Sequence, residues 1–137
     1  MSKGVYSLFI ELGKDQEIKI GKLGKFNFPK GFYIYTGSAL NNLEARLERH
    51  LKKQKKKFWH IDYLLANKNA KIISVLKIET SSKLECKLNQ KILKDLKASV
   101  LAKKFGSSDC NCESHLLYLK TNPLKNKSLL WNSSKIF

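Results

Sequence analysis

The alternation of strand-like and turn-like residues over the first 36 positions constrains the fold of this chain most. Three segments there are rich in β-branched and aromatic side chains, or alternate apolar with polar ones: 5–12 (VYSLFIEL), 17–21 (EIKIG) and 32–36 (FYIYT). Glycine and proline residues separate these segments and mark turns. The pattern predicts an antiparallel sheet, with 17–21 as the hairpin partner of 5–12.

A helical pattern follows the third strand. Asn41-Asn42 can cap a helix that runs to about residue 54. Three leucines recur every four residues within it, which predicts that they form its buried stripe: Leu43, Leu47 and Leu51.

The next 65 residues alternate again between helix and strand patterns. We expect a short helix over 58–65 and a strand over 71–79. Ser82-Lys83-Leu84-Glu85 has the spacing of a capping box that opens a third helix, and a further helical turn is expected within 97–104. With a final strand at 115–119, the predicted fold class is α+β: a small, mostly antiparallel sheet flanked by helices.

The length of the chain, 137 residues, is typical of one domain. We therefore expect a single domain over 1–137, with a core of about 4–120 and an irregular tail over 121–137 anchored by Trp131. No apolar run reaches the ~18–20 residues of a membrane span, and the first residues lack the pattern of a secretory leader. Three cysteines are too few for a disulfide framework, which favours a reducing, cytoplasmic setting.

Charge favours a polyanionic partner. The chain has 27 Lys and Arg against 11 Asp and Glu, a formal net charge of +16, and nucleic acid is the natural partner of such a field. Compositional bias is the alternative explanation for the lysines. Arg46 and Arg49 are the two arginines of the chain, close together on the expected helix. A basic run follows them: Lys52, Lys53, Lys55, Lys56 and Lys57.

An ordered set of motifs adds to this charge. Gly4-Val5-Tyr6 lies on the first strand and Tyr35-Thr36-Gly37 at the end of the strand before the helix, and Arg46, His50 and Glu85 follow on helices. In this order and on these elements, the set resembles the GIY-YIG nuclease family. Further motifs resemble its archaeal and bacterial Uri-type branch: Trp59-His60-Ile61-Asp62-Tyr63-Leu64, Glu85-Cys86, and residues 105–112 leading to His115-Leu116.

The resemblance implies a metal-dependent endonuclease that hydrolyses phosphodiester bonds. Glu85 would hold one Mg²⁺ or Mn²⁺, and Arg46 would contact the scissile phosphate. Tyr6 and Tyr35 would orient water, or one of them would act as general base if a cation lowered its pKa; His50 would bind phosphate or assist proton transfer. Each has a plainer alternative: a helix cap for Glu85, a pair with Asp62 or Glu79 for Arg46, ordinary packing for the tyrosines, and a place at the edge of the pocket for His50.

A second group of residues is expected to contact nucleic acid, with DNA favoured over RNA. It comprises Gly37, Ser38, Arg49, His60 and the lysines of the basic run. Gly37 would let the nucleic acid approach the backbone, or it would only end its strand. His60 or Tyr63 would line the substrate groove, or Trp59 would pack in the core with His60 satisfied by hydrogen bonds. A partner in DNA repair is also expected.

Three features depart from the family pattern: Thr36 in place of Ile or Val, a longer gap between the two tripeptides, and one extra residue between Gly37 and Arg46. They leave the substrate preference open, and a preference for structure over sequence is the hypothesis.

Cysteines offer a second chemistry. Four soft ligands could hold a structural zinc ion: Cys86, Cys110, Cys112 and His115. However, Cys-x-Cys is a poor match to the usual two-residue spacing, so the sequence favours buried cysteines in a turn, and a bridge from Cys86 to that turn is not required. Two other classes therefore stand beside the nuclease: a non-catalytic nucleic-acid-binding module of the same fold, and a zinc-stabilised adaptor.

Overall fold

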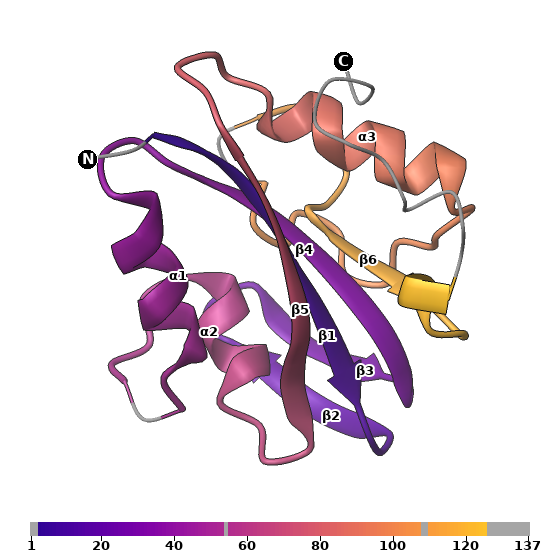
Figure 1. Cartoon of the computed structure of the whole chain (residues 1–137). Helices are drawn as coiled ribbons and strands as arrows, with labels where there is room; N and C mark the ends of the chain where they lie inside the picture. Colours follow the sequence, from indigo (N-terminus) through magenta and orange to yellow (C-terminus); the bar gives the residue numbers. More distant parts are fainter. Residues whose placement is uncertain (1–2, 54, 108–109, 126–137) are drawn as a thin grey trace.

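The central element of the computed structural model is a four-stranded antiparallel sheet, with strand order β5-β1-β4-β6 (Figure 1). The structure describes residues 3–53, 55–107 and 110–125. The strands span β1 Gly4–Leu12, β4 Gly31–Ala39, β5 Ala70–Glu79 and β6 Leu116–Leu119. The expected α+β class and antiparallel sheet are confirmed, and Trp131 lies outside the described residues.

The segment expected to pair with β1 forms a separate sheet instead. β2 (Gln16–Ile20) pairs with β3 (Gly24–Phe28), a strand that the sequence analysis did not predict. The predicted β1–β2 hairpin is therefore wrong. The physical reason is that β4 and β5 occupy both edges of β1 over its whole length, so its hydrogen-bonding groups are already used.

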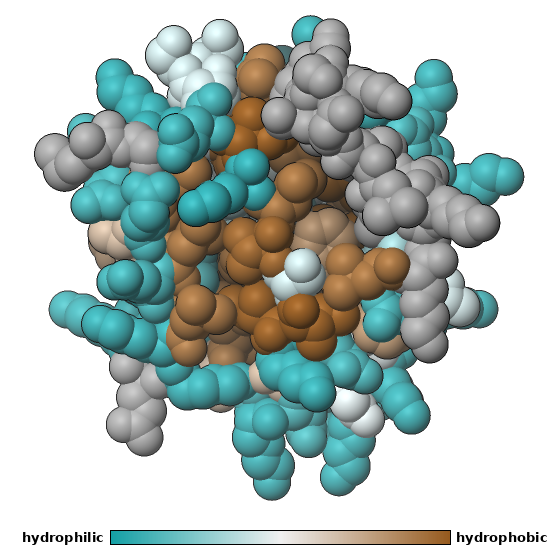
Figure 2. Space-filling view, viewed as in Figure 1, coloured by the Kyte–Doolittle hydropathy of each residue, from teal (hydrophilic) through white to brown (hydrophobic). Residues whose placement is uncertain are grey.

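Helices cover the two faces of the large sheet. On one face, α1 (Leu43–Leu51), α2 (His60–Leu65) and the β2–β3 hairpin share an apolar core with inward-facing residues of β1 and β4. On the other face, α3 (Glu85–Asp95) packs through Leu88 and Ile92 onto a second core (Figure 1). In the same view, apolar side chains gather over the middle of the molecule and hydrophilic ones surround them (Figure 2).

Several helix boundaries differ from expectation. Asn42 caps α1 as predicted, since its Oδ1 accepts from the Ala45 amide at 3.0 Å. The helix nevertheless ends at Leu51, before the expected residue 54, and Leu51 is 60% exposed, so it is not part of a buried stripe. The reason is that Lys52 adopts an extended conformation and closes the helix.

The region around α3 shows two further differences. The predicted capping box is wrong, because α3 begins at Glu85 with Leu84 at the cap position and no side-chain cap; the Ser82 amide instead donates to the Thr80 hydroxyl. Residues 97–104 form turns, and Ser99 pairs with Tyr118 of β6 through backbone hydrogen bonds. Residues 123–125 make one 3-10 turn. No helix within the described residues is long and apolar enough to cross a membrane.

Candidate functional site

The residues expected to act in catalysis come from four different elements and converge. Four of them, which we call the tyrosine cluster, lie in mutual contact: Tyr6 on β1, Tyr35 on β4, and Arg46 and His50 on α1. Glu85, the first residue of α3, interacts electrostatically with both phenols. The register of the sheet explains the convergence, because Tyr6 pairs with Gly37 and its ring lies diagonally across from Tyr35, with centroids 6.4 Å apart.

A short hydrogen bond joins the first strand to the first helix. The Tyr6 hydroxyl lies 2.7 Å from Nε2 of His50, and both side chains are buried. Burial lowers the pKa of His50 to about 4, so the ring is neutral near pH 7 and Nε2 can accept the hydroxyl proton. Burial also raises the pKa of Tyr6 to about 12, against the opposing influence of Arg46.

Tyr35, like Tyr6, is buried. Its ring centroid lies 6.3 Å from that of His50. Burial, followed by the neighbouring Tyr6, holds the pKa of Tyr35 well above its usual value. A cation would therefore be needed before either phenol could serve as a base near neutral pH.

Gly37 makes room for the tyrosine cluster. A Cβ at this position would lie 2.6 Å from the Tyr6 hydroxyl oxygen, which is closer than atoms in contact can be. This packing role was not foreseen from the sequence, where Gly37 and Ser38 were assigned to nucleic-acid contact. The Ser38 carbonyl accepts a hydrogen bond from Nη1 of Arg46 at 2.9 Å.

Trp59 lies against both arginines. The Arg46 guanidinium carbon lies 4.3 Å from the indole centroid and that of Arg49 lies 4.4 Å from it, within the range of cation–π contact. Arg49 also donates to both carboxylate oxygens of the buried Asp62, at 2.9 and 3.0 Å. The Arg46–Asp62 pair that was expected as the alternative does not form, because Asp62 pairs with Arg49 instead.

Asp62 is the polar centre of this arrangement. Besides Arg49, its carboxylate accepts from the backbone amides of Phe58 and Trp59. Burial opposes its ionisation, but these hydrogen bonds outweigh burial and hold its pKa below the usual value. A role for Asp62 beyond a pair with Arg46 was not foreseen from the sequence. The signal that could have indicated it is the position of this acid three residues after Trp59, the N-cap residue of α2.

Two lysines of the basic run bind the protein's own backbone. Lys53 Nζ donates to the carbonyls of Leu65, Asn67 and Ala70. Lys55 Nζ donates to three carbonyls at the end of α1, those of Arg49, His50 and Lys52. Burial lowers the pKa of both ammonium groups. The side chains of three others in the run are exposed: Lys52, Lys56 and Lys57.

His60 is tied to the loop that precedes β6. Its Nδ1 accepts the Gly106 amide at 2.8 Å, and its ring lies 5.7 Å from that of Phe105. This is the hydrogen-bonded, packed arrangement that the sequence analysis weighed as the alternative to groove lining. Gly106 has φ +67°, and a Cβ there would lie 2.9 Å from the Tyr35 ring, so only glycine fits without strain.

The four soft donors come together in the structure. We call them the thiol cluster: Cys86 on α3, and Cys110, Cys112 and His115 in and after the loop before β6. Their ligand atoms all lie within 4.8 Å of one another, and all three cysteines are free thiols. The cluster could hold a metal ion, and its donors suit Zn²⁺ better than Mg²⁺. The local Cys-x-Cys spacing did not predict that these four donors would come this close together.

Distances within the thiol cluster agree with a tetrahedral zinc site. His115 Nε2 lies 3.5 Å from Cys110 Sγ and 3.6 Å from Cys86 Sγ. Zn–S bonds of about 2.3 Å and Zn–N bonds of about 2.0–2.1 Å at tetrahedral angles place sulfur and nitrogen about 3.5 Å apart. Burial, together with the two neighbouring cysteines, raises the pKa of the Cys86 thiol.

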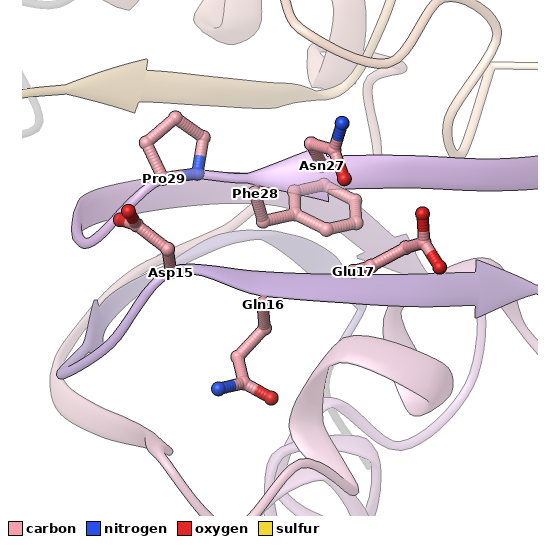
Figure 3. A pocket seen from close by; sticks show the side chains of 6 residues that line it. All are labelled: Asp15, Gln16, Glu17, Asn27, Phe28 and Pro29. Carbon is pink, nitrogen blue, oxygen red and sulfur yellow. The ribbon is translucent and has the colours of Figure 1, made fainter.

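A shallow pocket of about 290 Å³ lies elsewhere, along the β2–β3 hairpin (Figure 3). Its lining includes the carboxylates of Asp15 and Glu17 and the ring of Phe28. The Asp15 carboxylate accepts the Lys30 amide at 2.7 Å. Since the pocket contains none of the residues singled out from the sequence, it is separate from both clusters.

Fold and site together define a small α+β protein in which a tyrosine–histidine–arginine cluster adjoins a set of metal-binding donors. Residues 5–135 match the model of the family described as Domain of unknown function DUF123. The chain belongs to that family. No curated protein and no solved structure matches it.

Proposed function

We propose that the protein is a divalent-metal-dependent endonuclease related to the GIY-YIG nucleases, acting on nucleic acid in DNA repair or processing. The observation that supports this most is the convergence of Tyr6, Tyr35, Arg46 and His50 in one cluster, within electrostatic reach of Glu85. Tyr6 and Glu85 are far in the sequence from the other three residues, and a purely structural role does not call for this set of groups in one place.

The chemistry of the cluster suits phosphodiester hydrolysis. Neutral His50 can accept the hydrogen bond of the Tyr6 hydroxyl through their 2.7 Å contact, and the phenol oxygen would then accept a hydrogen bond from the attacking water and orient it, while solvent takes the water's proton. The resulting hydroxide forms a bond to phosphorus as the bond to the leaving oxygen breaks, and the leaving oxygen is protonated by solvent. Arg46, whose Nη1 is held by Ser38, would turn its other N–H groups to the phosphate.

The metal would be one Mg²⁺ or Mn²⁺ at Glu85. A carboxylate oxygen is the ligand these hard cations prefer, and one carboxylate plus the substrate phosphate and water can hold them. When bound, the ion would neutralise charge that builds up on the phosphate. It would also favour ionisation of the two buried phenols, whose pKa values burial raises.

The thiol cluster would hold structural Zn²⁺. Three thiolates and one imidazole complete a tetrahedron and leave no open position for a reacting water, which distinguishes structural from catalytic zinc sites. We therefore assign zinc to stability and the hard cation to hydrolysis.

Substrate binding would rest on charge. The net charge of +16 attracts any nucleic acid, and Lys52, Lys56 and Lys57 lie exposed after the helix that carries Arg46. Nothing in this charge distinguishes one base sequence from another. DNA of particular structure, such as a branched duplex, is therefore the proposed substrate class.

The test is cleavage of branched, single-stranded and duplex DNA and RNA, with Mg²⁺, Mn²⁺ or neither. We expect metal-dependent cleavage by the native protein and a loss of about 10²–10³-fold in rate in Glu85→Ala and Arg46→Ala. The matched control is Asp95→Ala, which removes an acid from the other end of α3 where it pairs with Lys91 at 3.0 Å. Binding without cleavage under every condition would contradict the proposal and favour a non-catalytic module.

A further inference from the structure

His115 faces two different groups with its two ring nitrogens. Its side chain is fully buried, and Nε2 lies among the sulfur atoms of the thiol cluster. Nδ1 lies 3.4 Å from Oε2 of Glu85, the carboxylate assigned above to the hard cation. Glu85 and Cys86 are consecutive on α3, so one helical turn serves both centres.

The chemistry of a zinc-bound imidazole determines which group would donate in the contact between His115 and Glu85. When Nε2 binds a metal, the ring carries its proton on Nδ1 and donates it to a neighbouring oxygen, which fixes both the tautomer and the ring plane. A carboxylate is the strongest such acceptor available in a protein. The Glu85 carboxylate lies at an ion-pair distance of 3.4 Å from Nδ1, from which it can take up this orienting role beyond the ligands themselves.

The segment that carries the metal donors is also fastened to the tyrosine cluster. The His115 carbonyl accepts the Thr36 amide at 3.1 Å, next to Tyr35 on β4. Gly106 lies between the Tyr35 ring and the His115 Cβ. On the helix side, the buried Asn89 donates to the Ser114 carbonyl at 2.7 Å, which locks α3 to the residue before His115.

We propose that Glu85 belongs to both centres: it orients His115 on the zinc ion of the thiol cluster, and zinc binding in turn holds its carboxylate in position at the tyrosine cluster. The first half of this proposal stands on the thiol cluster alone. The second half, that zinc regulates hydrolysis, rests on the proposed nuclease function.

Zinc affinity tests the first half without any nuclease assay. Zn²⁺ alone is titrated against a chromophoric chelator in the native protein, Glu85→Ala, Glu85→Gln and the control Asp95→Ala. Loss of an orienting partner typically costs 10–100-fold in metal affinity, and we expect this loss in Glu85→Ala. Glu85→Gln keeps a carbonyl oxygen for Nδ1 and should remain within about threefold of the native protein, on the same principle.

Three results would overturn the first half. They are an affinity in Glu85→Ala within about twofold of native, an equal loss in Glu85→Gln, or an equal loss in Asp95→Ala. Replacing Zn²⁺ by Co²⁺ gives an independent readout, since the absorption bands of bound Co²⁺ report how its ligands, His115 among them, are arranged around the ion. We expect these bands to change in Glu85→Ala and to be restored in Glu85→Gln.

Hydrolysis tests the second half. The same protein preparation is assayed with Mg²⁺ when zinc-loaded, zinc-stripped and reloaded, with circular dichroism to follow the fold. We expect stripping to lower the rate by at least about 10-fold and reloading to restore it. An unchanged rate after stripping would overturn the regulation. A zinc-loaded protein that never cleaves would instead contradict the proposed function, and the zinc affinities would still decide the role of Glu85.

Discussion

The tyrosine cluster and the thiol cluster lie side by side but are held together in different ways. The tyrosine cluster is carried by β1, β4 and α1, and hydrogen bonds between protein groups connect its members. The thiol cluster comes from the first turn of α3 and an irregular segment, and its sulfur atoms crowd one another. The first is organised by the sheet register, whereas the second brings together donors that could hold a metal ion.

The largest effect is expected from zinc removal, because the thiol cluster is the part that we propose to hold a metal ion. A metal held at about 1,000 times its Kd adds about 4 kcal/mol to stability. For a chain of this length, chelation should lower Tm by about 10–15 °C, measured by calorimetry. In Cys112→Ser the same chelator should cause no further decrease in Tm. If chelation left the Tm of the native protein unchanged, neither cluster would depend on a metal ion for its stability.

A slightly smaller effect is expected from Asp62→Ala, which acts on the tyrosine-cluster side. The change leaves the Arg49 guanidinium and the amides of Phe58 and Trp59 without their shared acceptor. We expect a loss of about 3 kcal/mol in unfolding free energy, measured by urea denaturation. Glu11→Ala, which removes an exposed carboxylate paired with Lys71 at 3.7 Å, should cost less than about 0.5 kcal/mol. Equal losses would contradict the assigned role of Asp62.

Acid should weaken the tyrosine cluster through His50. Its pKa is about 4 in the fold, where burial disfavours the charged ring, and about 6.5 when unfolded. The unfolded chain therefore binds more protons between these values, so stability is lost as pH falls from about 6.5 to 4, by about 2–3 kcal/mol. His50→Gln should remove that slope in denaturation curves measured across this range. A slope unchanged in the variant would place the titrating group elsewhere.

The smallest effect is expected from Tyr6→Phe, which removes one hydroxyl and leaves the buried Nε2 of His50 unpaired. The cost should be about 1–2 kcal/mol in unfolding free energy. Tyr118→Phe is the matched control, since its exposed hydroxyl donates to the Lys30 carbonyl at 3.0 Å and should cost about 0.5 kcal/mol or less. If the two variants lost equal stability, the Tyr6–His50 hydrogen bond would contribute no more to the free energy of unfolding than an exposed one.

Local patterns in the sequence predicted much of the fold. The strands at β1, β4, β5 and β6 and the Asn42 cap follow from side-chain alternation and capping chemistry. Strand β3 was missed because its two apolar residues, Phe26 and Phe28, alternate with polar ones over only five positions. Pairing partners were not predictable, since β1 bonds to β5, some 60 residues away, rather than to its neighbour.

The two clusters differ again in what could be foreseen. The members of the tyrosine cluster were identified by an ordered motif. That identification depends on the order of the residues along the chain, so an error of one or two residues in the end of a helix or strand does not change it. The thiol cluster was discounted because its local spacing, Cys-x-Cys, fits zinc poorly. Its fourth member, Cys86, reaches the others only because α3 is locked to the segment before β6 by Asn89, which is a tertiary contact without a sequence signature.

The internal hydrogen bonds of Lys53, Lys55 and Arg49 have a consequence for the release of counterions when the protein binds DNA. Seven basic residues lie between positions 46 and 57. These three bind internal carbonyls or Asp62, and Arg46 donates to the Ser38 carbonyl but is counted with the remaining lysines because it is the residue assigned to the phosphate. Each phosphate neutralised on duplex DNA displaces about 0.9 of a condensed cation. This stretch should therefore contribute the ion release of about four contacts rather than seven, so that affinity falls less steeply with added salt than the run of lysines suggests.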